Sequence, residues 1–187
     1  YGQVAKLTAS DAAGDDEFGR SVAIADGTIV VGANQYRYSG GGAVYVFSTS
    51  DGGVTYVQMA KLTASDAAMG DYLGYSLAID GSTVVIGAPQ DDIGTAIGGS
   101  NRGSAYVFAL PAPTDYAETG KLTVADAAAG DYFGGSVAID GETIVVGAYA
   151  KNFGTGAAYV YRTSDGGTTH DHVAKLTSPG AVGDAFG

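Results

Sequence analysis

The hydrophobic residues of this chain fall in short runs rather than along one stripe. The most apolar runs, at 29–31, 84–86 and 144–146, contain only Val and Ile. A strand with one face in water alternates apolar and polar residues, so these runs predict strands that are covered on both faces. No window keeps helical spacing beyond one turn, and each short Ala-rich run leads at once into Gly-Asp, which predicts loops.

The runs belong to an internal repeat. Phe-Gly or Leu-Gly pairs at 18–19, 73–74, 133–134 and 186–187 are 55, 60 and 53 residues apart. Three further motifs keep the same order: Lys-Leu-Thr at 6–8, 61–63, 121–123 and 175–177, (Val/Ile)-Gly-Ala at 31–33, 86–88 and 146–148, and (Val/Ala)-Tyr-Val-(Phe/Tyr) at 44–47, 105–108 and 158–161. A repeat of this length indicates a stacked architecture.

Each repeat contains four predicted strands. In the third repeat they are 133–139, 143–148, 157–161 and 172–177. The first two are separated by Asp140-Gly141, a two-residue signal for a type I′ turn, because both turn positions need positive φ. The third and fourth are joined by a second Gly-rich turn.

We therefore predict an all-β fold of β-propeller blades, each a four-stranded antiparallel sheet. With no helices available, only neighbouring sheets can cover the apolar second strands. The first strand has a small face and a large face, as close stacking requires. The blades are expected at about 17–63, 72–123 and 132–177, with a partial fourth repeat at 178–187. The alternative is a β-solenoid, whose usual repeat is about half as long.

Three complete blades are too few for a closed ring, which needs at least about four. We expect an incomplete ring in this chain. Further repeats of the same chain, or other copies that form a ring or a filament, are then needed to cover the open blade faces.

The composition limits the kinds of molecule that this chain is expected to bind. The formal net charge is −11, from 20 acidic and 9 basic residues, which disfavours nucleic acid and is compatible with cations or basic proteins. Cysteine is absent, so disulfides and thiolate metal sites are excluded. The apolar runs span only a few residues, which predicts no membrane insertion.

The motifs Phe18-Gly19-x-Ser21 and Val31-Gly32-Ala33, together with the literal Gly87-Ala88-Pro89, resemble the FG-GAP repeat of integrin α-chain propellers. The short hairpins are most similar to the variety in bacterial and algal surface proteins. The resemblance implies an extracellular or cell-surface location and a role in adhesion. Its calcium loop, Asp-x-Asp-x-Asp-Gly, is replaced here by two-residue turns such as Asp26-Gly27, so that site is not carried over.

Strand alternation divides the connections between two rims. The Asp-Gly hairpins lie on one rim, and the long loops lie on the other, which the integrin resemblance makes the ligand face. The long-loop rim carries 11 of the 20 acids and is expected to be strongly negative. Paired carboxylates recur on it, and with loop carbonyls they could hold calcium: Asp11, Asp16, Asp66, Asp71, Asp126 and Asp131. For Asp16, Asp71 and Asp131 the alternative is that each carboxylate fixes its loop by accepting backbone N–H bonds.

The loop from Pro89 to Gly103 is the longest and least repetitive. Irregular loops on a rigid scaffold are where binding usually lies. The candidate ligand-binding residues there and in the equivalent loops are Asp91, Asp92, Asn101, Arg102, Tyr36, Tyr38, Tyr149 and Phe153. The loop could instead be a tolerated insertion, and the aromatic residues could pack between blades.

Three functions are consistent with these features. The first is a non-enzymatic extracellular scaffold that binds protein or glycan through the acidic rim. The second is a structural subunit that assembles through open blade faces. The third is a glycosidase or lyase on a propeller scaffold, which would need catalytic groups near the axis. No catalytic triad or zinc signature is present, and His170 and His172 lack an evident third metal ligand.

Overall fold

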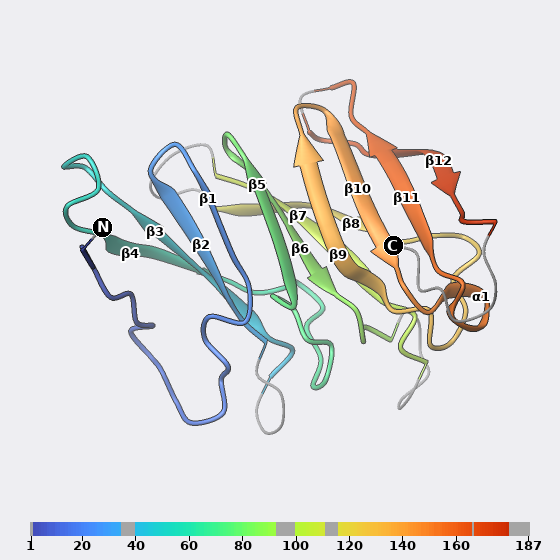
Figure 1. Ribbon diagram of the computed structural model, residues 1–187, viewed down its shortest axis with the longest axis horizontal. Helices are drawn as coiled ribbons and strands as arrows, with labels where there is room; N and C mark the ends of the chain where they lie inside the picture. Colours follow the sequence, from blue (N-terminus) through green and yellow to red (C-terminus); the bar gives the residue numbers. More distant parts are fainter. Residues whose placement is uncertain (1, 35–39, 93–99, 111–115, 166, 180–187) are drawn as a thin grey trace.

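The computed structural model describes residues 2–34, 40–92, 100–110, 116–165 and 167–179. Within these ranges, twelve strands form three four-stranded antiparallel sheets in sequence order, which stack side by side (Figure 1). Blade 1 comprises β1 (Val22–Ala25), β2 (Thr28–Ala33), β3 (Ala43–Ser48) and β4 (Val57–Leu62). Blade 2 comprises β5 (Ser76–Asp80), β6 (Thr83–Ala88), β7 (Ser104–Ala109) and β8 (Ala117–Leu122). Blade 3 comprises β9 (Phe133–Asp140), β10 (Thr143–Ala148), β11 (Ala157–Arg162) and β12 (Asp171–Leu176).

The predicted all-β architecture is therefore confirmed, and the solenoid alternative is wrong because the sheets are antiparallel meanders. The predicted hairpins are present, and in blade 1 both Asp26 and Gly27 have positive φ, as a type I′ turn requires. In blade 3 the predicted turn position is wrong by one residue, because Asp140 still pairs with Thr143, and the two-residue turn is Gly141-Glu142, in which Gly141 alone has positive φ. The third and fourth strands shift register once in each blade, after Val46, Val107 and Val160. Equal irregularities at equivalent positions show that the repeat holds in three dimensions.

Each blade has two different faces. We call the face toward the next blade in sequence the trailing face and the face toward the preceding blade the leading face. In the first junction, Val30, Val46 and Leu62 of the trailing face pack against Ile86, Tyr106 and Phe108 of the next leading face. The second junction repeats the arrangement with Val107 and Leu122 against Phe133, Tyr159 and Tyr161. Each such side chain contributes about 1.5–3 kcal/mol when it is fully buried.

The regular recurrence of the Phe-Gly and Gly-Ala motifs in the repeats has a structural cause at these junctions. A Cβ added to Gly32 would lie 2.2 Å from the Gly74 carbonyl oxygen, and one added to Gly87 would lie 2.0 Å from that of Gly134. The same carbonyls accept hydrogen bonds from Ser21 Oγ at 2.6 Å and Ser76 Oγ at 2.8 Å. The motif is thus one half of a close backbone contact between blades.

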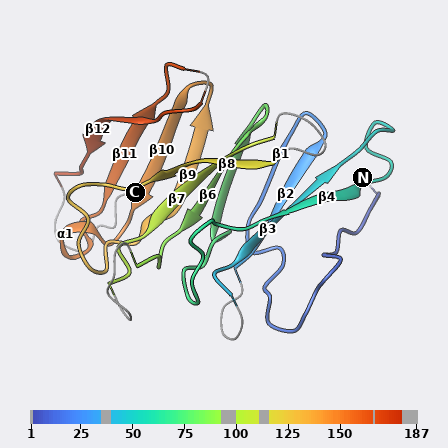
Figure 2. The ribbon, with the colours of Figure 1, turned by 180° about the vertical axis from the view of Figure 1, so that it is seen from behind.

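The middle blade has a blade on each side, and its second strand confirms the prediction that the apolar runs are covered on both faces. Val84, Val85 and Ile86 in the middle blade are completely buried. Val145 in blade 3 is only half-buried, because no described blade covers its trailing face. The three blades form an arc rather than a closed ring (Figures 1 and 2).

The one helical segment among the described residues, α1 (Lys151–Gly154), is a four-residue turn with positive φ at Asn152 and Phe153. The Ala-rich runs are not helical, as predicted. Within the described part of the chain, no helix has the length and apolar character that a membrane crossing needs.

Candidate functional site

The connections lie on two rims. The hairpins β1–β2, β5–β6 and β9–β10 are at the upper edge of Figure 1, and the long connections, including α1, are at the lower edge. We call the first the hairpin rim and the second the loop rim.

A cluster of three side chains recurs on the loop rim of each blade, and we call it the rim cluster. An aspartate from the loop before the blade accepts a hydrogen bond from a tyrosine of the third strand and forms an ion pair with a lysine of the fourth strand. In blade 1, Asp11 bonds Tyr45 at 2.8 Å and Lys61 at 2.7 Å. In blade 2, Asp66 bonds Tyr106 at 2.8 Å and Lys121 at 2.6 Å. In blade 3, Asp126 bonds Tyr159 at 3.0 Å and Lys175 at 2.6 Å.

These bonds stabilise the charged form of the aspartate. Lys61 and Tyr45 together lower the pKa of Asp11. Burial works against the effect at Asp66 and Asp126, yet bonds from lysine and tyrosine still lower the pKa of both carboxyls. Part of the negative charge predicted for this rim is therefore neutralised by lysines of the Lys-Leu-Thr motif.

The clusters of blades 2 and 3 differ at one equivalent position, three residues after the Gly-Ala motif. Blade 3 has Lys151, whose ammonium lies 2.6 Å from Asp131 and 3.7 Å from Asp126. Blade 2 has Asp91 instead, a buried carboxylate that lies 2.7 Å from both Lys121 and the Tyr106 hydroxyl. In blade 2 one lysine, Lys121, therefore pairs with two carboxylates, whereas in blade 3 two lysines pair with two carboxylates.

Because of this difference, Asp71, the counterpart of Asp131, forms no ion pair with a lysine among the residues that the structure describes. Its side chain accepts the Ala68 N–H at 2.7 Å and is 6% exposed. Burial, and then the charge of Asp91, raise the pKa of Asp71 to about 6.

We expect Asp71→Asn to stabilise the protein at pH 7.5 and to reduce its pH dependence. A carboxyl whose pKa is raised on folding contributes stability that falls as pH rises from about 4 to about 6. The wild type should therefore gain about 1 kcal/mol between pH 7.5 and 5 relative to the variant, measured by urea unfolding at both pH values. An amide at Asp71 can still accept the Ala68 N–H, so the loop is kept. Equal pH dependence of the two proteins would show that Asp71 is not the titrating group.

The predicted metal-ligand residues are all accounted for by protein partners. Asp16, Asp71 and Asp131 each accept a backbone N–H three residues earlier, at 2.6–2.7 Å, which is the alternative loop-fixing role. Asp11, Asp66 and Asp126 belong to the rim clusters. Nowhere in the described ranges do three acidic or histidine side chains meet in a way that could hold a metal ion. The calcium prediction gains no support from this donor set.

The predicted ligand residues of the long loop act mainly within the protein. Asp91 is buried in the rim cluster. Asp92 Oδ1 accepts hydrogen bonds from the backbone N–H groups of Ser100 and Asn101 at 2.9 and 2.8 Å, which joins the two ends of the loop. The carbonyls of Asn101 and Arg102 accept the N–H groups of Tyr132 and Phe133, so they connect blade 2 to blade 3.

The aromatic candidates divide into two kinds. Tyr149 packs over Gly135, where a Cβ would lie 2.7 Å from its ring, and it stacks on Tyr132 with centroids 5.3 Å apart. Phe153 is instead 92% exposed, beside a hollow of about 350 Å³ lined in part by Gly130, Asp131 and Asn152. Tyr36 and Tyr38 lie outside the described residues.

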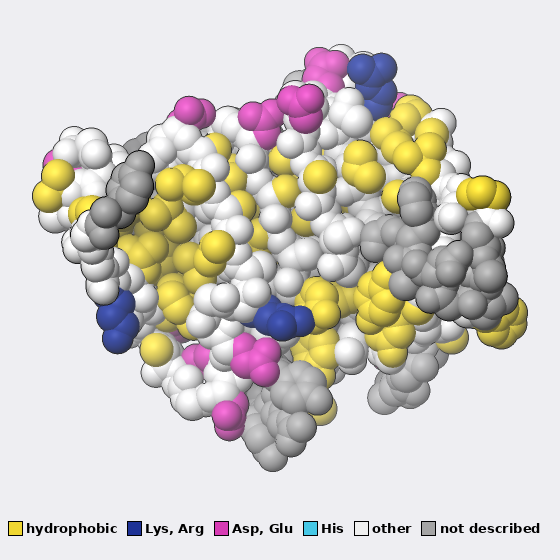
Figure 3. Space-filling view, in the orientation of Figure 1, with side chains coloured by type: hydrophobic (Ala, Val, Ile, Leu, Met, Phe, Trp, Pro, Cys, Tyr) yellow, Lys and Arg dark blue, Asp and Glu magenta, His cyan; other side chains and the backbone are white. Residues whose placement is uncertain are grey.

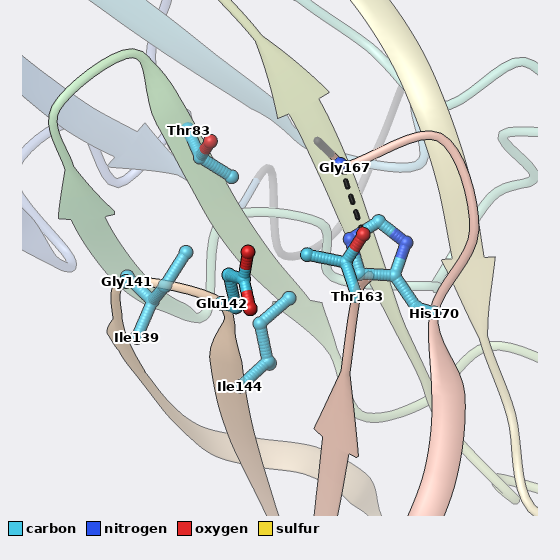
Figure 4. Close-up of a pocket in the computed structure, with 8 residues that line it drawn as sticks. All are labelled: Thr83, Ile139, Gly141, Glu142, Ile144, Thr163, Gly167 and His170. Atoms are coloured by element: carbon cyan, nitrogen blue, oxygen red, sulfur yellow. Dashed lines mark hydrogen bonds between the residues drawn. The ribbon is translucent and has the colours of Figure 1, made fainter. Parts of the chain in front are cut away.

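A second hollow, of about 190 Å³, lies at the hairpin rim between blades 2 and 3 (Figure 4). Its wall includes Thr83 from blade 2 and Glu142, Thr163 and His170 from blade 3. Burial lowers the pKa of His170, and Thr163 Oγ1 accepts the Gly167 N–H at 2.9 Å. No sequence pattern predicts this hollow, because it forms only where two blades meet.

Sequence reasoning missed the tyrosines and lysines of the rim clusters, although both recur with the repeat: Tyr45, Tyr106, Tyr159, Lys61, Lys121 and Lys175. Their recurrence was a usable signal, but their distance from the aspartates in sequence hid the contact. The space-filling view also shows acidic side chains along the hairpin edge (Figure 3), so negative charge is not confined to the loop rim.

Comparison with known proteins gives the fold and the repeat. The FG-GAP repeat family matches residues 1–47, 56–108 and 116–161. A crystal structure of Sqt1 from Saccharomyces cerevisiae is similar, with a TM-score of 0.54 at 8% sequence identity. The match covers 88% of this chain and 37% of Sqt1, so this chain spans well under half of that protein's length. Likeness at such low identity concerns the fold alone. A search of curated proteins found no match.

Proposed function

This chain belongs to the FG-GAP repeat family, and from that premise we propose that it is a non-enzymatic scaffold at the cell exterior that binds protein or glycan through its loop rim. Propellers of one fold serve many functions, so the proposal rests on the site and not on the fold. The rim clusters support the proposal because they bond the loop aspartates to tyrosines and lysines of the third and fourth strands. A rigid base reduces the ordering cost when a loop binds a partner.

The observation that carries the proposal is the presentation of Phe153. The ring of Phe153 is 92% exposed, and contact of a phenyl ring with water is unfavourable, so burial against a partner would stabilise the complex. Phe153 also has a φ of 61°, a backbone conformation that is rare for bulky residues. Such strain clusters at binding sites. The loop is held by hydrogen bonds to the Lys151 carbonyl from Gly156 N–H at 2.9 Å and from Thr155 Oγ1 at 3.2 Å.

The surroundings of Phe153 suit a polar partner with an apolar patch. Asn152 and Asp131 are among the residues that line the hollow beside the ring. Aromatic side chains beside amide groups pack against the C–H faces of sugars and against apolar side chains of proteins. Net negative charge favours neutral glycans and basic protein surfaces over polyanions.

We expect Phe153→Ala to weaken binding by about 30-fold, the effect of losing one binding hot spot of about 2 kcal/mol. The measurement is biolayer interferometry against a panel of immobilised oligosaccharides and basic peptides. Val54→Ala is the matched control, because Val54 is 63% exposed but lies in the β3–β4 turn. Equal binding by wild type and Phe153→Ala, or loss of binding in Val54→Ala alone, would contradict the loop-rim site.

A further inference from the structure

We propose that the hollow between blades 2 and 3 at the hairpin rim binds a primary alkylammonium group, the end of a lysine side chain or of a free alkylamine. The hollow lies on the rim opposite α1 and Phe153 (Figure 1), so the site goes beyond the proposed loop-rim function and does not depend on it. Its wall comes wholly from two neighbouring blades, within residues 83–170.

The hollow occurs where blade 3 departs from blade 2 at two positions. Strand pairing makes Thr163 the equivalent of Leu110 and His170 the equivalent of Tyr116. Leu110 and Tyr116 pack against the apolar cluster of the first junction. Threonine and histidine are smaller and more polar, and at the second junction a space of about 190 Å³ lies beside them. Pockets for drug-sized ligands begin at about 300 Å³, so this space suits a group of a few atoms.

His170 lies against blade 2 at a position that has no side chain. A Cβ added to Gly120 of β8 would lie 3.4 Å from His170 Nδ1, so the glycine leaves room for the ring between the blades. Burial lowers the pKa of His170, and the charge of Asp165 only partly opposes this effect. The imidazole is therefore neutral at pH 7, with one ring nitrogen able to accept a hydrogen bond.

The polar groups around the hollow are suited to accept hydrogen bonds from a cation. Figure 4 shows the Glu142 carboxylate directed toward the space between Thr83 and Thr163. Thr163 Oγ1 donates to Asp165 Oδ1 at 2.8 Å and accepts the Gly167 N–H at 2.9 Å, and a hydroxyl oxygen has a second lone pair for a further donor. An ammonium group has three N–H donors and no acceptor, which matches this set.

The charge around the hollow also favours a cation. Asp80 of blade 2 accepts the N–H of Gly141, a residue of the wall, at 2.6 Å, so a second carboxylate lies at the edge of the hollow. The neighbouring cation, Arg162, follows Tyr161 on β11, and by strand alternation it points to the opposite face of the sheet from the junction into which Tyr161 packs. The net charge of −11 adds a long-range attraction for cations.

The same wall offers an apolar surface for the stem of an alkylamine. Ile139 and Ile144 line the hollow beside the polar groups, and Ile144 is buried. Methylene groups of a lysine or an alkylamine lie along apolar surface of this kind while the charged end meets the polar groups. A neutral alcohol could use the isoleucines and threonines but would gain nothing from the charge of Glu142.

The test is a titration with n-butylammonium, followed by two-dimensional amide NMR spectra of the whole chain. We expect a dissociation constant of about 1 mM, as for a ligand of five non-hydrogen atoms, and shifts of the amide signals of Gly141 and Gly167, which line the hollow. n-Butanol, which has the same stem without the charge, should bind about fivefold more weakly.

A second arm uses Nα-acetyl-lysine methylamide, which presents the same ammonium group as a lysine of a protein does. Tighter binding of this compound than of n-butylammonium would assign the site to a lysine side chain of a partner. Tighter binding of n-butylammonium would assign it to a free alkylamine. Either order supports an alkylammonium site.

Two variants test whether the hollow is the site. Glu142→Gln should weaken n-butylammonium binding about fivefold, the upper end for an exposed ion pair, whereas Glu17→Gln, which removes the same charge from the loop rim, should leave it unchanged. His170→Tyr introduces the residue that blades 1 and 2 have at Tyr56 and Tyr116, so it should fill the hollow and remove measurable binding. The dispersion of the amide spectrum checks that each variant folds.

Three results would overturn the proposal. The first is the absence of shifts at Gly141 and Gly167 up to about 20 mM n-butylammonium, well above the expected dissociation constant. The second is equal binding of n-butanol and n-butylammonium. The third is binding by a folded Glu142→Gln variant that equals that of Glu17→Gln, since the carboxylate would then have no part in it.

Discussion

Lys151→Ala is expected to lower the free energy of unfolding by about 3 kcal/mol, as is typical when one partner of a buried ion pair is removed. Lys151 and Asp131 are each 4% exposed, and their charged atoms lie 2.6 Å apart. The substitution leaves a buried carboxylate with no cation beside it, and the cost is the desolvation of that charge. Urea unfolding followed by circular dichroism measures the change.

Two comparisons make this prediction specific. Lys61→Ala removes an ion pair whose partners are 34% and 49% exposed, so its effect should be below about 1 kcal/mol. The double variant Lys151→Ala/Asp131→Ala should lose less stability than the sum of the single variants, because no unpaired charge remains. Additive single effects would mean that packing of the lysine stem, and not the ion pair, is responsible.

Gly87→Ala is expected to destabilise the protein by about 3 kcal/mol, at the upper end of the usual cost of overpacking. The added Cβ would lie 2.0 Å from the Gly134 carbonyl oxygen and 2.2 Å from Ser76 Oγ. A backbone carbonyl of the next blade cannot move aside without separating the two sheets. Thermal unfolding and urea midpoints should both fall.

Gly14→Ala is the matched control for this prediction. It adds the same methyl group at a position with no heavy atom within 4 Å of the new Cβ and with no positive φ. Its stability should equal that of the wild type or exceed it slightly, because alanine restricts the unfolded chain. If Gly87→Ala were as stable as Gly14→Ala, the close contact between blades would be disproved.

The strands and their order could be predicted from sequence because their causes are local. Alternation, Asp-Gly turns and unbroken Val/Ile runs are properties of a few adjacent residues, and they identified the four strands of the third repeat to within one or two residues. The repeat then added the stacking, since a run such as Val84–Ile86 can be buried on both faces only by other sheets.

The candidate site could be predicted only in outline. The aspartates of the loop rim were visible as repeated acids, but Asp11 and Lys61 are 50 positions apart, and no local rule connects them. The exchange of Asp91 for Lys151 likewise becomes meaningful only when both are seen beside the same pair of carboxylates. Phe153 was recognised as an aromatic loop residue, whereas its exposure depends on the turn that carries it.

The sequence alone determined that this protein is built of repeated antiparallel blades, because turn chemistry and side-chain period act over a few residues. Only the tertiary structure decided which charges neutralise one another and which glycines meet a carbonyl of the next blade. Those outcomes depend on distances between residues of different blades, and such distances are set by how whole sheets pack.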